Sequence, residues 1–368
     1  MDKPTEPLDI EIINGTIHKI GKDLKTDLTS IIDGSGHFIM PGLIDCHVHL
    51  RTVTGALFRK ETKESIKEQQ DLHLNSYLAA GVTTVLDAAP PENLYAEINE
   101  LEKSRVIPQV IYLAPFLTPK DGYFGLDSHR HPFYNDLWPP IEDLSQIETY
   151  IRSARKMNPL GVKVTVENGM GPFKVFPLFE RKFQEEIVRS AKVNNSPIFV
   201  HSYSEEEFEE ALKYEPNAFV HLGFNENQPS NKLLKKIKKS KAYVVSTSAI
   251  YKMMLLVWDQ EIFDEPWFKR LVPEKQIKTA QDQKANKKLL KIMAKKNKPA
   301  WLPGFLAEAL SGVFINKTQI TKQFNSAKKA TLKMYNSGIP IVMGADAGNW
   351  PAFTTFFHRV GSTLEMMP

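Results

Sequence analysis

Eight short apolar runs alternate with amphipathic helical stretches along most of this chain, and this alternation constrains the fold more than any other feature of the sequence. Repeated strand–helix units of this kind build a parallel sheet that is covered by helices. The runs are Leu43 to His47, Val82 to Asp87, Val110 to Ala114, Val162 to Val166, Ile198 to His201, Ala218 to His221, Tyr243 to Thr247 and Ile339 to Ala345. Eight such units predict a (β/α)₈ barrel, the TIM barrel of the α/β class, with its active site at the carboxyl ends of the strands.

Several helix ends can be read from the residues. The stretch from Glu64 to Ala80 ends at Gly81, a residue suited to the left-handed position that follows a helix. Ser204 and Glu207 have the spacing of a capping box, so a helix should begin just after the fifth strand and leave His201 on the rim of that strand. Two further helices are expected over Arg181 to Val193 and Thr318 to Asn336.

Residues 1–41 follow a different pattern. Isoleucines lie on both sides of the turn Asn14-Gly15, which is typical of a β-hairpin, and the apolar groups at residues 31–32 and 38–40 predict further short strands. We therefore expect a small β element over residues 1–41 and the barrel over residues 42–368.

Two segments exceed a minimal barrel. Residues 116–140 form a long aromatic loop that contains His129 and His131, and loops of this length after a barrel strand are often lids over the active site. Residues 249–310 are rich in lysine and are expected to form a helical insertion between the seventh and eighth strands.

Composition excludes several classes of protein. The 47 Lys plus Arg residues exceed the 43 Asp plus Glu residues by only four, which is too small a surplus for a nucleic-acid-binding footprint, and the basic tract from Lys232 to Lys241 has the spacing of a solvated helix face. Cys46 is the single cysteine, so neither an internal disulfide nor a cysteine-based zinc site can form. No apolar run is long enough for a membrane span, and the first residues lack the apolar core of a signal peptide. The chain as given is expected to be cytoplasmic by default, with export open if a signal has been removed.

The first strand ends in a His-x-His pair. Because side chains alternate along a strand, His47 and His49 lie on the same side and can bind one ion together. The alternative is two unconnected histidines, since a lone pair of this kind also arises by chance.

Lys163 lies on the fourth strand, opposite a face formed by the valines at 162, 164 and 166. If the valines pack on the helices, Lys163 points towards the barrel axis, where a buried ammonium loses its proton. A neutral amine near a cation can add carbon dioxide and become a carbamate that bridges two metal ions. An ordinary lysine that reaches solvent with its charged end is the alternative.

Three more polar residues end apolar runs: His201, His221 and Asp346. Each also has a purely structural alternative: either histidine can be a hydrogen-bonded core residue, and Asp346 can be the N-cap of a helix. Together with His47, His49 and Lys163 they fall at the carboxyl ends of different strands, which converge on one end of a barrel. This convergence favours a metal-dependent active site.

The sequence resembles the amidohydrolase superfamily, in its imidazolonepropionase-like and prolidase-like branch of metal-dependent hydrolases. The segment Met40 to His49 is similar to the entry motif of that superfamily, and Ala80 to Val85 is similar to its second strand. The later strands are matched in order by Gly161-Val162-Lys163, Val200-His201, Val220-His221, Val244 to Thr247 and Gly344 to Asn349.

The resemblance implies two divalent metal ions, with zinc as the usual occupant. His47, His49 and Asp346 would hold one ion and His201 and His221 the other, with N6-carboxylated Lys163 and a hydroxide between them. The hydroxide would attack the carbonyl carbon of an amide or related C–N bond, while Asp346 would move the proton to the leaving group.

The resemblance also implies more chain than this sequence contains. Relatives continue past the eighth strand with a closing helix and with strands that complete the β element begun near residue 10. The β element of residues 1–41 is therefore expected to be a partial β-sandwich, and the chain to be shortened.

Two other functions remain open at this level. A mononuclear deaminase of the same superfamily would carry an acid just after the sixth-strand histidine, whereas His221 is followed by Leu222-Gly223-Phe224. A barrel that binds metal or ligand without catalysis would have lost a ligand, and none is missing.

The expected partner is a small-molecule substrate such as a dipeptide, an N-acyl amino acid or a cyclic amide, and a homo-oligomer is compatible with the sequence. The aromatic loop favours an apolar or cyclic substrate part. Candidates for substrate contact, beside the predicted ligands or in the loop, are Glu167, Tyr203, Asn349, Trp350, His129 and His131.

Overall fold

The computed structural model describes residues 6–25, 30–50, 63–91, 93–123, 138–169, 176–224, 228–271, 274–296, 298 and 301–347. The chain separates into two compact units, Met1–Gly42 and Leu43–Pro368.

The first unit contains a β-hairpin. Strand β1 (Asp9–Ile13) pairs antiparallel with β2 (Thr16–Gly21), and the turn residues Asn14 and Gly15 both have positive φ, as a tight two-residue hairpin turn requires. The strands expected near residues 31–32 and 38–40 are wrong, because the described residues from 30 to 42 contain no strand. Ile32 is 92% exposed and Phe38 is 82% exposed. No described residue pairs with these segments, so they have no neighbouring strand to bond with, and their exposed backbone groups face solvent.

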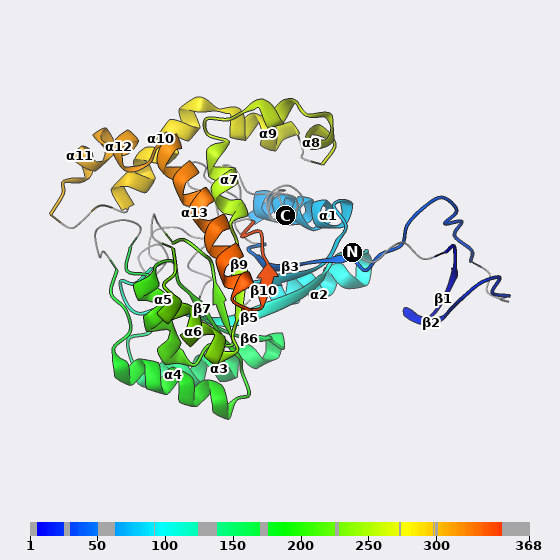
Figure 1. The fold of residues 1–368 in the computed structure, drawn as a ribbon, viewed down its shortest axis with the longest axis horizontal. Coiled ribbons are helices and arrows are strands. Elements are labelled where there is room, and N and C mark those ends of the chain that lie inside the picture. Colours follow the sequence, from blue (N-terminus) through cyan, green and yellow to red (C-terminus); the bar gives the residue numbers. More distant parts are fainter. Residues whose placement is uncertain are drawn as a thin grey trace. The chain divides into compact units, whose positions relative to one another are not determined.

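The second unit is the predicted barrel. Its eight strands are all parallel and follow one another around the sheet in chain order, from β3 to β10 (Figure 1). They are β3 (Leu43–Val48), β4 (Val82–Asp87), β5 (Gln109–Leu117), β6 (Gly161–Thr165), β7 (Ile198–His201), β8 (Ala218–Val220), β9 (Tyr243–Ser246) and β10 (Ile341–Met343). The fold prediction is confirmed, with each predicted run lying on the expected strand.

The barrel closes where its last strand meets its first. The backbone N–H of Asp346 donates to the carbonyl of His47 at 2.8 Å, and the N–H of His49 donates to the carbonyl of Ala347 at 2.8 Å. Val48 and Ala347 form a parallel bridge at the same place. These bonds lie just beyond the end of β10, at the carboxyl end of the barrel. We call this junction the β3–β10 seam.

Helices cover the barrel and follow the strands as expected. They are α1 (Lys63–Ala79), α2 (Leu94–Ser104), α3 (Leu144–Ser153), α4 (Arg181–Val193), α5 (Glu205–Ala211), α6 (Asn231–Ser240) and α13 (Lys317–Asn336). Gly81 adopts φ +80° after α1, and Ser204 and Glu207 form the predicted capping box of α5. The apolar residues of α6 are buried, which confirms that its lysines form a solvated face.

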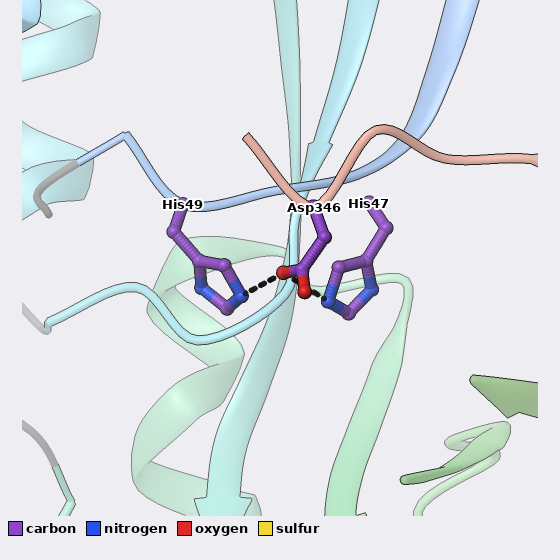
Figure 2. A group of neighbouring side chains, drawn as sticks. All are labelled: His47, His49 and Asp346. Atoms are coloured by element: carbon purple, nitrogen blue, oxygen red, sulfur yellow. Dashed lines mark ion pairs between the residues drawn. The ribbon is translucent and has the colours of Figure 1, made fainter. Parts of the chain in front are cut away.

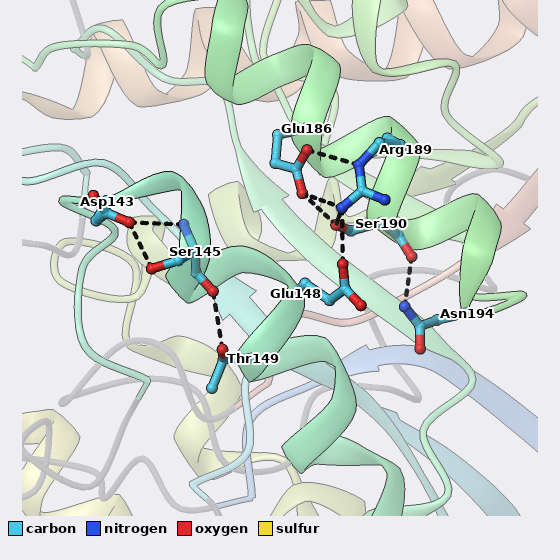
Figure 3. A network of polar contacts seen from close by, with 8 residues as sticks. All are labelled: Asp143, Ser145, Glu148, Thr149, Glu186, Arg189, Ser190 and Asn194. Atoms are coloured by element: carbon cyan, nitrogen blue, oxygen red, sulfur yellow. Dashed lines mark hydrogen bonds and ion pairs between the residues drawn. The ribbon is translucent and has the colours of Figure 1, made fainter.

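The outer surfaces of α3 and α4 are joined by polar contacts (Figure 3). Arg189 on α4 binds Glu186 on its own helix and reaches Glu148 on α3 at 2.8 Å. Asp143 caps the start of α3 by accepting from the N–H of Ser145. Such exposed pairs each contribute less than about 1 kcal/mol, so the two helices are held mainly by their buried faces.

The alternation predicted for β6 is observed. Val162, Val164 and Val166 belong to the main apolar core, which they share with Ile187 of α4. Lys163 lies on the opposite face of the strand and is buried. This pattern directs the lysine to the inside of the barrel.

The segment between β9 and β10 is helical, as expected. It contains α7 (Ala249–Leu255), α8 (Pro266–Leu271), α9 (Glu274–Gln281), α10 (Gln283–Lys296), α11 (Gly304–Ala309) and α12 (Ser311–Phe314). Ile250, Tyr251 and Leu255 of α7 pack against α13. No helix among the described residues is both long and apolar enough to cross a bilayer.

The long loop after β5 is described only at its two ends. Residues 124–137, which include His129 and His131, lie outside the described residues. At the near end, the chain turns back at Pro119 to Gly122, and Thr118 Oγ1 donates to the carbonyl of Tyr123 at 2.8 Å. This turn fixes Tyr123 close to the carboxyl end of the barrel.

Candidate metal centre

Three predicted ligands meet at the β3–β10 seam (Figure 2). Nε2 of His47 lies 3.5 Å from Oδ1 of Asp346, and Nε2 of His49 lies 3.1 Å from the same oxygen. One potential ligand atom from each residue lies within 4.8 Å of the others. Two imidazole nitrogens and a carboxylate oxygen at this spacing are a suitable donor set for a divalent ion.

The backbone around these residues is unusually close-packed. A Cβ atom on Gly344 would lie 2.6 Å from Cβ of His47, so only glycine allows β10 to approach β3 here. Asp346 has φ +55°, a left-handed conformation that costs energy in a residue other than glycine. The seam therefore holds Asp346 in a strained geometry that directs its carboxylate towards the histidines.

Asp45 links the two sides of the β3–β10 seam through hydrogen bonds. Its Oδ1 accepts from the N–H of Ala345 at 2.9 Å and from the N–H of His47 at 3.2 Å, which ties β3 to β10. Burial raises the pKa of Asp45 to about 7. This residue positions both halves of the cluster, a role that the sequence reasoning did not assign to it.

His221 and His201 lie beside the cluster. The ring centroid of His221 is 4.7 Å from that of His47 and 4.5 Å from that of His201. His221 Nδ1 lies 2.8 Å from Oγ1 of Thr247 and 3.8 Å from Oδ2 of Asp346. The structure thus brings all four predicted histidines together.

Lys163 is buried beside them, and its Nζ has no hydrogen-bond partner among the residues that the structure describes. Burial lowers the pKa of Lys163 to about 7, although Asp346 acts in the opposite direction. A large fraction of this amine is therefore neutral near pH 7, as a carbamate-forming lysine must be. An orphaned buried amine of this kind fits a residue that completes its environment by modification and metal binding.

The charges of the ligands are set by this environment. Burial and then Lys163 lower the pKa of His47, to about 3, and that of His201, to well below its usual range. Burial by itself raises the pKa of Asp346, but the neighbouring histidines lower it well below the usual range. Neutral imidazoles and an ionised carboxylate are the forms that bind metal ions.

Glu167 and Tyr203, expected beside the ligands, are both in contact with His201. Oε2 of Glu167 lies 2.5 Å from Nε2 of His201, and the ring of Tyr203 contacts that of His201 edge to face. Asn349 and Trp350 lie outside the described residues, as do His129 and His131.

Two further tyrosines belong to this region. Tyr123 stacks on His201 with ring centroids 4.9 Å apart, and the hydroxyl of Tyr251 on α7 lies beside Gly223. Tyr203 stacks on His221, so the rings of Tyr123 and Tyr203 lie against two of the histidines. Tyr251 was not expected here, because no sequence signal connects α7 with the carboxyl ends of the strands.

Glu207 was also missed as a site residue. Its Oε1 accepts from the N–H of Asn168, and its Oε2 accepts from the N–H groups of Tyr203 and Ser204. The capping box gave a signal for the contact with Ser204 alone. The other two bonds fasten the loops that follow β6 and β7 to each other.

Comparison with known proteins gives a family match over most of the chain. The model of the "Amidohydrolase family" matches residues 38–355. A dihydroorotase of Carboxydothermus hydrogenoformans is 31% identical over 123 residues, which are 32% of this chain and 26% of that protein. An imidazolonepropionase of Vibrio vulnificus is 46% identical over 48 residues, which are 13% of this chain and 12% of that protein. The chain thus aligns with about a quarter or less of the length of these curated relatives.

Solved structures share the fold at low sequence identity. A prolidase complexed with N-methylphosphonate-L-proline has a TM-score of 0.61 at 16% identity, with 90% of this chain and 71% of that chain covered. A Xaa-Pro dipeptidase with methionine bound in its active site has a TM-score of 0.61 at 16% identity, with 93% and 75% covered. These similarities support the barrel architecture.

Proposed function

Because the chain belongs to the amidohydrolase family, we propose that it is a metal-dependent hydrolase that cleaves an amide or related carbon–nitrogen bond. One observation carries the proposal. Four histidines, a buried lysine and a carboxylate from five strands lie together at one end of the barrel, and all of them except the partly exposed His49 are buried. Packing alone gives no reason to bury so many groups that bind metal ions.

We assign the residues as two sets. His47, His49 and Asp346 would hold one divalent ion and His201 and His221 a second, with zinc as the expected metal. Lys163 would join the sets after its neutral amine forms an N–C bond to carbon dioxide and releases a proton, which leaves a carbamate with two oxygen donors. When bound, such ions lower the pKa of a coordinated water and polarise the carbonyl of the substrate.

The chain itself supplies the proton transfer and the enclosure. Asp346 is ionised, so its carboxylate can accept the proton of the attacking water and pass it to the leaving nitrogen. Tyr123 stacks on His201 and Tyr203 stacks on His221, so aromatic rings cover both histidines of the second set. Their rings favour a substrate with an apolar or cyclic part.

The names of the relatives support a small substrate with a scissile C–N bond, such as a dipeptide, an N-acyl amino acid or a cyclic amide. We also propose a division of the chain into two domains, which nearly coincides with its two compact units. Residues 1–41 form the small β element and residues 42–368 form the hydrolase barrel, with residues 116–140 as a lid and residues 249–310 as a helical insertion.

The direct test measures metal content and hydrolysis together. The purified chain, supplied with zinc, should bind two ions and hydrolyse at least one member of a panel of dipeptides, N-acyl amino acids, lactams and lactones. Chelation should abolish the activity and added zinc should restore it. Failure to bind any of Zn²⁺, Mn²⁺ or Co²⁺ would contradict the proposal, and a single ion per chain would favour a mononuclear deaminase.

A further inference from the structure

We propose that Glu167 and Thr247 are positioning residues that determine which ring nitrogen of His201 and of His221 faces the metal ion. The inference rests on the proposed function. Glu167 contacts Nε2 of His201, and Thr247 contacts Nδ1 of His221. Each imidazole has two nitrogens, so Nδ1 of His201 and Nε2 of His221 are the ones left to bind an ion.

The contact geometry distinguishes Glu167 from a direct ligand. Asp346 approaches three histidines at 3.1 to 3.8 Å, which is the spacing of ligands that converge on a shared point. Glu167 instead makes one contact with a single histidine, at 2.5 Å, which is closer than the range of about 2.7 to 3.2 Å usual for an N–H···O hydrogen bond and leaves no room for an ion between the two atoms. The pair is almost fully buried, with 1% of the Glu167 side chain and 5% of the His201 side chain exposed.

The backbone fixes this pair from both sides. Glu207 binds the N–H of Asn168, which follows Glu167, and the N–H of Tyr203, two residues after His201. The N–H of Val166 donates to the carbonyl of His201 at 2.9 Å and joins the same two segments. The carboxylate and the imidazole are therefore held together by the protein alone.

This arrangement has a direct effect on His201 as a ligand. If Nδ1 binds a cation, Nε2 must carry the hydrogen, and Oε2 of Glu167 accepts it. A carboxylate in this position fixes the plane of the ring and makes the histidine a stronger donor to the metal. The Thr247 hydroxyl does the same for His221 through a neutral hydrogen bond, which is weaker.

The test is zinc affinity, measured on the full chain by competition with a chromogenic chelator. Glu167→Ala should weaken the binding of one of the two ions by about 10- to 100-fold while two ions still bind at saturation. Glu167→Gln keeps an acceptor for the Nε2 hydrogen and should have a smaller effect, as should Thr247→Val. The matched control is Glu185→Gln, the same change at an exposed position on α4, which should leave zinc affinity unchanged.

A second measurement reports the ring directly. In ¹⁵N-histidine-labelled protein without metal, Glu167→Ala should change the ¹⁵N shifts of the His201 ring, and Glu185→Gln should not. If Glu167→Ala does not fold, as judged by its thermal transition, the zinc affinity and the ¹⁵N shifts are both measured on Glu167→Gln.

Two results would overturn the inference. Wild-type zinc affinity in both Glu167 variants would show that the contact does not position His201. Loss of one whole equivalent of zinc in both variants, even at saturation, would make Glu167 a direct ligand. In either case a wild-type chain that binds two ions leaves the proposed function intact, whereas a wild-type chain that binds none overturns the function and the inference together.

Discussion

Asp346 contacts three of the proposed ligands and also takes part in closing the barrel. Its two oxygens lie near His47, His49 and His221, and its own backbone N–H closes the barrel. A substitution at this position should therefore separate the binding of metal from the transfer of protons.

Asp346→Asn keeps the size of the side chain and one coordinating oxygen but removes the group that accepts a proton at neutral pH. We expect the variant to fold, to keep much of its zinc and to lose about 10²- to 10⁴-fold in turnover, the usual contribution of general acid–base catalysis. Metal analysis and steady-state kinetics check this. Near-normal turnover with metal present would remove Asp346 from proton transfer.

Lys163→Ala removes the amine that would become the bridging carbamate. We expect zinc content to fall and activity to disappear, with partial rescue by short carboxylic acids, whose oxygens can occupy the vacated space. A high-resolution structure that shows two bound metal ions and an unmodified Lys163 turned away from them would contradict this prediction.

At this scale the sequence predicted which residues meet but not how each one is held. The alternation of β6 was enough to direct Lys163 inwards, and the strand ends were enough to gather the histidines. The contacts of Glu167 and Glu207 depend on side-chain conformations and on loop paths between β6 and α5. No periodicity encodes those details.

Among the elements, β10 must approach β3 closely at Gly344, the residue that follows it. Gly344→Ala would place a Cβ 2.6 Å from that of His47 and 3.0 Å from a methyl group of Val245. We expect the free energy of unfolding to fall by about 1 to 3 kcal/mol, the usual cost of overpacking, and zinc affinity to fall with it. Urea unfolding and chelator competition measure the two effects.

The control for this substitution is Gly312→Ala on α12, where a Cβ would meet nothing within 4 Å. Alanine is favoured over glycine in a helix, so this variant should be as stable as the wild type or slightly more so. Equal stability of the two alanine variants would show that the seam can relax around an added methyl group.

The barrel elements were predictable because burial and alternation act within each strand–helix unit. The prediction of strands near residues 31–32 and 38–40 was wrong because those strands would have depended on pairing outside such a unit. Apolar residues such as Ile32 satisfy a local pattern, but a strand also needs a neighbour to bond with, and the sequence pattern does not report whether one is present.

For the molecule as a whole, the buried Lys163 gives stability a specific pH dependence. Its pKa is about 7 in the folded protein and 10.5 ordinarily, so between these values the unfolded chain holds a proton that the folded chain does not. The free energy of unfolding of the metal-free protein should therefore rise with pH, by up to about 1.4 kcal/mol per pH unit.

The best range for this measurement is about pH 8 to 9, because the buried Asp45 carboxyl, with a pKa of about 7, acts in the opposite direction at lower pH. Burial raises the pKa of Cys46 from 9.0 to about 11, which acts in the opposite direction at higher pH. Urea unfolding in chelator and CO₂-depleted buffer should show the rise in the wild type and lose it in Lys163→Met. An identical slope in both proteins would assign the dependence to other groups.

The β3–β10 seam joins parts of the chain that are far apart in synthesis. Oδ1 of Asp45 and the N–H of Ala345 are 300 residues apart in sequence, and pairings at such separation form late in folding. His47 and His49 leave the ribosome early, but they acquire Asp346 only when the last strand docks. The three ligands of the first ion thus come together only when the barrel closes. An ion bound there would link β3, which is synthesised early, to the segment that follows β10, which is synthesised late.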